Sequence, residues 1–146
     1  MDAAERDRLV MFVAQLRIDL PWIFDGAQPY VTAEVYDRLW PAWEAALARN
    51  DIDVMEMRIG SGEYDEELDR AGLSGPELEF KLTGYEAARA SARESTQGRP
   101  APRLFKRWLG WLDVVLGSLV SVLGAGEALK ELKEGVETEV GSADGA

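Results

Sequence analysis

The stretch that decides the fold is residues 108–126, which read WLGWLDVVLGSLVSVLGAG. Twelve of its nineteen residues are apolar, four are Gly, two are Ser and one is Asp. A helical projection gathers the small and polar residues on one narrow stripe and leaves the large apolar side chains on the rest of the surface. The segment is therefore expected to be an apolar helix.

Three interpretations of this helix are open. It is the central core helix of a bundle, a surface helix that docks a partner or a second copy through its Gly stripe, or a membrane-contacting helix. The basic residues before it suit a lipid headgroup boundary, whereas Asp113 would cost about 2.5–3.5 kcal/mol at the centre of a bilayer. The candidate interaction surface comprises Arg103, Lys106, Arg107, Trp108, Gly110, Trp111, Asp113, Gly117, Ser121 and Gly124.

The N-terminal segment, Asp2 to Leu20, has the apolar period of a helix with one buried stripe, formed by Leu9, Phe12, Val13, Leu16 and Leu20. Asp2 and Glu5 favour its start through the helix dipole. Pro21 is predicted to end it, and residues 22–31 to form a loop. A second helix is expected from Thr32 to Leu47, kinked or split at Pro41.

Residues 51–94 predict three further helices. Asn50 can cap a helix over 52–59, although the same residues also fit an alternating strand; helix is preferred because no partner strand is visible. A short acidic helix over 63–70 should end at Gly72 in the C′ position. Ser74 and Glu77 form a predicted capping box, which opens a helix running to about Glu94.

These elements predict an all-α fold of five or six helices in a compact bundle. We expect residues 1–94 to form a helical subdomain, residues 95–102 to be a Pro-containing linker and residues 103–140 to be a C-terminal helical hairpin or tail that packs on the first part. The charged helix of this last part is expected over 127–140, and residues 141–146 should be a disordered tail.

Composition excludes several kinds of chemistry. The chain has no Cys and no His, so the usual nucleophile–base pairs and zinc sites cannot be built. Its formal net charge of −11 opposes nucleic-acid binding. Ten acidic against two basic residues lie between Asp51 and Glu79, which indicates a solvated face or a docking patch for a basic partner. Without a secretory signal at residues 1–6, cytoplasmic residence is expected.

The functional expectation is a non-catalytic helical interaction module, an adaptor or regulatory subunit that binds a protein partner or itself. No cofactor, metal or small-molecule substrate is expected. The first alternative is a membrane-acting effector that inserts or oligomerises through residues 103–126. The second is an enzyme that uses carboxylates and a divalent ion, for which Asp51, Asp53 and Glu56, or Glu63, Glu66 and Glu67, are the candidate ligands. Tyr64 and Tyr85 show no acid–base partner in the sequence and are expected to pack as rings.

Overall fold

The computed structural model describes residues 1–27, 33, 37, 41, 44, 45, 50–94 and 102–123. In this part of the chain the fold is all-α, as the sequence predicts, and no strand occurs. Five helices have defined bounds: α1 (Ala3–Ala27), α3 (Asp51–Gly60), α4 (Asp65–Arg70), α5 (Gly75–Glu94) and α6 (Pro102–Leu123). The isolated positions 33, 37, 41, 44 and 45 are helical as well. Residues 95–101 of the predicted linker, the charged helix over 127–140 and the tail lie outside the described residues, as does most of the helix expected from Thr32 to Leu47.

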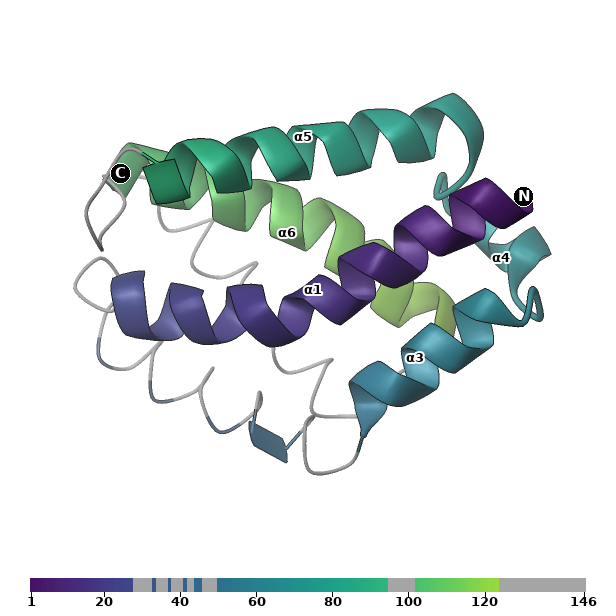
Figure 1. Cartoon of the computed structure of the whole chain (residues 1–146), viewed down its shortest axis with the longest axis horizontal. Helices are drawn as coiled ribbons and strands as arrows, with labels where there is room; N and C mark the ends of the chain where they lie inside the picture. The colour runs from purple at the N-terminus through teal and green to yellow at the C-terminus, as the bar shows by residue number, and fades with distance from the viewer. Residues whose placement is uncertain are drawn as a thin grey trace.

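The core is one cluster to which all five helices contribute. α5 lies along α6, α1 packs on α3, and α1 passes across α6 in the view of Figure 1. The ring of Trp22 on α1 lies 5.4 Å from that of Trp108 on α6, so α6 also contacts α1. Because both partners of α6 are apolar on their inner sides, the helix buries most of its apolar surface within this cluster.

The prediction that Pro21 ends the first helix is wrong. α1 continues through Pro21 to Ala27, so residues 22–27 of the expected loop are helical, and the remainder of that loop lies outside the described residues. A proline inside a helix removes one backbone hydrogen bond and costs about 3 kcal/mol. Tertiary packing offsets this cost, because Leu16 and Leu20 are buried before the proline and Trp22 packs against the core after it.

The ambiguity over residues 52–59 is resolved as helix. α3 buries Ile52, Met55 and Ile59, the three residues that fit the helical period. Asn50 occupies its N-cap, but with a left-handed backbone (φ 59°) and no side-chain capping bond. The expected cap therefore has the right position and a different mechanism, since Asn tolerates this conformation better than most residues.

The turn from α4 to α5 follows the predicted Gly72 stop. Gly72 has a φ of +74°, and the N–H groups of Gly72 and Leu73 donate to the carbonyls of Asp69 and Leu68. This pair of bonds is the Schellman arrangement, with the buried side chains of Leu68 and Leu73 closing it. The acidic helix starts at Asp65, two residues later than expected.

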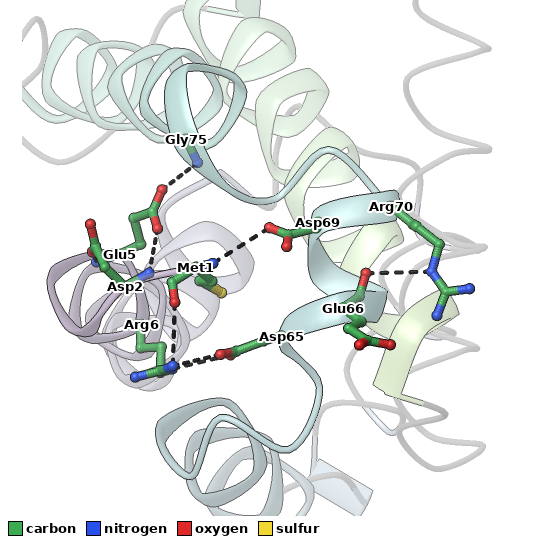
Figure 2. Close-up of polar contacts among 9 residues, drawn as sticks. All are labelled: Met1, Asp2, Glu5, Arg6, Asp65, Glu66, Asp69, Arg70 and Gly75. Atoms are coloured by element: carbon green, nitrogen blue, oxygen red, sulfur yellow. Dashed lines mark hydrogen bonds and ion pairs between the residues drawn. The ribbon is translucent and has the colours of Figure 1, made fainter.

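The N-terminal end of α1 is joined to the α4–α5 region by polar contacts (Figure 2). Asp2 and Glu5 exchange backbone-to-carboxylate hydrogen bonds of 2.6 and 2.9 Å, a reciprocal capping box at the start of α1. Glu5 also accepts from the N–H of Gly75, the first residue of α5. The start of α5 is thus held by a carboxylate from α1, a contact that the expected box of Ser74 and Glu77 does not include.

Candidate functional site

The interaction surface predicted on α6 divides into a buried and an exposed part. Trp108 is fully buried, Gly117 is buried, and Leu112, Val115, Leu116 and Leu119 complete the buried face. Most of the apolar surface of α6 is therefore buried, as the interpretation as a core helix predicts. No described helix is long and apolar enough to cross a membrane.

The remaining predicted residues differ in exposure. Arg103, Lys106, Arg107 and Ser121 are exposed, Gly110, Trp111 and Asp113 are half-buried, and Gly124 lies outside the described residues. Trp111 covers α5 at Gly84, where an added Cβ would meet its ring at 2.5 Å, and it contacts the ring of Phe80 at 5.6 Å. The structure thus brings Trp111 onto α5 rather than into solution.

A second apolar surface lies on the outer side of α1. Met11 is 71% exposed and Ile18 is 59% exposed, although both belong to a helix that also buries a full apolar stripe. Ala3, Ala4 and Ala14 share this outer side, and its polar members are Asp7 and Gln15. A surface helix normally presents charged residues to water, so a helix that is apolar on both sides indicates a further contact.

Between this outer face and α5 lies a groove of about 440 Å³. Its floor and walls come from two helices: Arg8, Met11, Phe12, Ala14, Gln15 and Ile18 from α1, and Tyr85 and Glu86 from α5. The rings of Phe12 and Tyr85 meet edge to face at 4.9 Å and are both buried, so they form a firm apolar floor. Mostly apolar concavities with a few polar groups are typical of binding sites.

One end of the groove is bordered by charge. The Arg8 guanidinium lies 3.3 Å from the Glu79 carboxylate and 3.5 Å from that of Glu86. Both carboxylates are more than half exposed, so the single cation is shared by two acids on the α5 side of the groove. Exposed Asp7 adds a third acid one helical turn before Met11. Arg8 and Glu86 line the groove itself, and together with the adjacent Glu79 and Asp7 they carry a net charge of −2.

Beneath the groove, a buried polar network fixes α1 against α5. Asp19 has no exposed surface, and it accepts hydrogen bonds from the Tyr85 hydroxyl at 2.7 Å and from the Arg89 guanidinium at 2.6 Å. Burial, followed by the charge and hydrogen bond of Asp19, raises the pKa of Tyr85 well above its ordinary value, so the phenol stays protonated. Because Asp19 has no exposed surface, its carboxylate positions the Tyr85 ring of the groove floor and does not itself contact a ligand.

The expectation that Tyr85 has no acid–base partner is wrong, because Asp19 is its partner. Both residues sit on the apolar stripes of their helices, and Arg89 follows Tyr85 by one turn on the same stripe. The sequence did contain a signal for this contact, because charged residues occupy positions on the apolar stripes of two separate helices. Buried charges occur almost only as pairs, so Asp19 and Arg89 could have been matched. The expected ring packing is found for both tyrosines, since Tyr85 packs on Phe12 and Tyr64 has the Arg58 guanidinium 5.8 Å from its ring centre.

Some of the acidic residues proposed as metal ligands form ion pairs with an arginine instead. Asp53 and Glu56 both pair with Arg17 of α1, and the hydrogen bond from Arg17 to Glu56 is the main cause that raises the pKa of Arg17. Among the described residues no group of three or more acidic side chains is placed to hold a metal ion. Asp65 likewise pairs with Arg6 at 2.5 Å, and this hydrogen bond lowers the pKa of Asp65.

No protein-family model, curated protein or solved structure matches this chain. The candidate site is therefore defined by geometry alone: an apolar groove on α1 and α5 with an acidic rim and a wall held by buried hydrogen bonds.

Proposed function

We propose that the chain is a non-catalytic helical interaction module, an adaptor or regulatory subunit, and that it binds a protein partner in the groove between α1 and α5. The observation that carries the proposal is the exposure of Met11 and Ile18 beside a firm aromatic floor. Exposed apolar patches next to a concavity mark contact surfaces in soluble proteins.

The proposal moves the binding surface from α6 to α1. Most large apolar residues of α6 belong to the core cluster, whereas Met11 and Ile18 on the outer side of α1 lie outside it and are exposed. A partner would gain apolar burial at α1 without unpacking the bundle. The acids Asp19, Asp53, Glu56 and Asp65 are each engaged with an arginine, which favours a structural role for these carboxylates over a catalytic one.

Site-specific photo-crosslinking in the cells that make the protein tests this proposal. A photoreactive residue is placed at position 11 or 18 in the groove, and at position 57 as the matched control. Met57 on α3 is 67% exposed, similar to Met11, and does not line the groove. We expect one discrete crosslinked product from positions 11 and 18 and none from 57. Equal products at all three positions, or none at any, would contradict the proposal.

A further inference from the structure

We infer that the groove accepts a basic amphipathic helix, with an apolar stripe that covers Met11 and Ile18 and with Lys or Arg residues beside that stripe. This inference rests on the proposed function and adds the chemistry of the partner. It follows from the shape of the groove and from the sign of the charge along its rim.

The shape favours a helix. Met11 and Ile18 are seven residues apart on one helical face, a separation of about 10 Å along the axis. Side chains at i, i+3 or i+4, and i+7 of a second helix have the same separation, so they can lie against both residues and the groove between α1 and α5. Ala14, between the two exposed residues, leaves room for a close approach.

The charge favours a basic partner. Glu79, Glu86 and Asp7 border the apolar surface, and Arg8, the cation among the described residues that line the groove, already pairs with two of these acids. The whole chain, of which these residues are part, also carries a net charge of −11. An acidic helix would face uncompensated repulsion, while Lys or Arg beside the apolar stripe would gain charge complementarity and faster association. A second copy of the chain would bring the same acidic groove, so its charge complements this surface less well than that of a basic helix.

Two helical peptides with one identical Leu stripe are the probes, one with Lys and the other with Glu at the polar positions. Their affinities for the full chain are measured by fluorescence anisotropy at about 50 and 200 mM salt, a range over which exposed charges become well screened. We expect the Lys peptide to bind at least about tenfold more tightly than the Glu peptide at low salt, and the difference to shrink at high salt.

Matched variants separate the groove from the remaining surface. Met11→Gln combined with Ile18→Gln should weaken the Lys peptide by about tenfold or more, because two buried apolar contacts are lost, while Met57→Gln changes little. Glu79→Gln combined with Glu86→Gln should weaken it by about tenfold. The control for charge is Glu63→Gln combined with Glu66→Gln, which alters the net charge equally at two exposed sites on and before α4. All four sets change exposed residues, and circular dichroism checks that each variant folds.

The outcomes are distinct. If Met11→Gln with Ile18→Gln leaves peptide binding unchanged, the groove is not the site, and both the proposed function and this inference fail. If those substitutions weaken binding but the Lys and Glu peptides bind the unmodified chain with equal affinity at low salt, the groove is the site and the charge preference is wrong. A dimer in light scattering that the same substitutions dissociate would identify a second copy as the occupant and overturn the basic helix. Absence of binding by the Lys peptide to a monomer would also overturn it.

Discussion

α1 and α6 are both rich in apolar residues, yet the bundle uses them differently. α6 turns its apolar face into the core and leaves Arg103, Lys106 and Arg107 exposed at its start. α1 buries one apolar stripe and exposes a second that holds Met11 and Ile18. The difference teaches that the amount of apolar surface on a helix does not identify a docking site. What identifies it is the apolar surface that remains after the core has formed.

The largest expected effect contrasts the two helices directly. Trp108→Ala should lower the free energy of unfolding by about 3–5 kcal/mol, because a fully buried ring leaves a cavity. Ile18→Ala should change it by less than about 0.5 kcal/mol, as expected for an exposed side chain. Urea denaturation of both variants measures the difference. Equal losses would mean that α1 hides a contact or that α6 is not core.

The next effect concerns the inner side of α1. Asp19→Ala should cost about 3 kcal/mol, because it leaves the Arg89 guanidinium and the Tyr85 hydroxyl without their buried acceptor. Asp53→Ala is the control, since its pair with Arg17 is exposed and such pairs contribute about 0–1 kcal/mol. Thermal unfolding compares them. A loss at Asp53 as large as at Asp19 would refute the assigned role of burial.

Replacing two different glycines by Ala should change the stability by smaller amounts and in opposite directions. Gly84→Ala places a methyl group 2.5 Å from the Trp111 ring, so the ring must move and stability should fall by about 1 kcal/mol. At Gly110 an added methyl group meets nothing within 4 Å, and the higher helix propensity of Ala should raise stability by about 0.5–1 kcal/mol. Chemical denaturation reads both signs. Stabilisation by both substitutions would show that Trp111 does not cover Gly84.

The smallest expected effect is the loss of stability from ionisation of Tyr85, which occurs only at alkaline pH. The raised pKa of Tyr85 means that the unfolded chain loses its phenol proton first, so stability is fully present below about pH 10 and falls as the pH rises toward the folded pKa. Tyr85→Phe should remove this part of the alkaline loss. Unfolding followed from pH 8 to 11 in both proteins checks it, and identical slopes would argue against burial of the phenol.

Much of the fold was predictable because helix periods and end signals are local. The apolar stripe of α1, the helix over 52–59 and the stop at Gly72 each follow from residues within a few turns. The prediction that Pro21 ends the helix was wrong because the packing of Leu20 and Trp22 outweighs the local tendency of proline to end a helix. The groove was not predictable, because it depends on how α1 and α5 pack side by side and on which side chains that packing leaves exposed, and local helix periods do not specify either.

Hydroxyl-radical footprinting of the free protein, with each rate normalised to that of the unfolded chain, tests the central claim most directly. The claim is that the free docking surface is formed by Met11 and Ile18 on α1 and not by the apolar face of α6 that holds Trp108 and Leu112. We expect Met11 and Ile18 to be modified as readily as exposed Met57, while Trp108 and Leu112 are strongly protected. Fast modification of Trp108 and Leu112, together with protection of Met11 and Ile18, would contradict it.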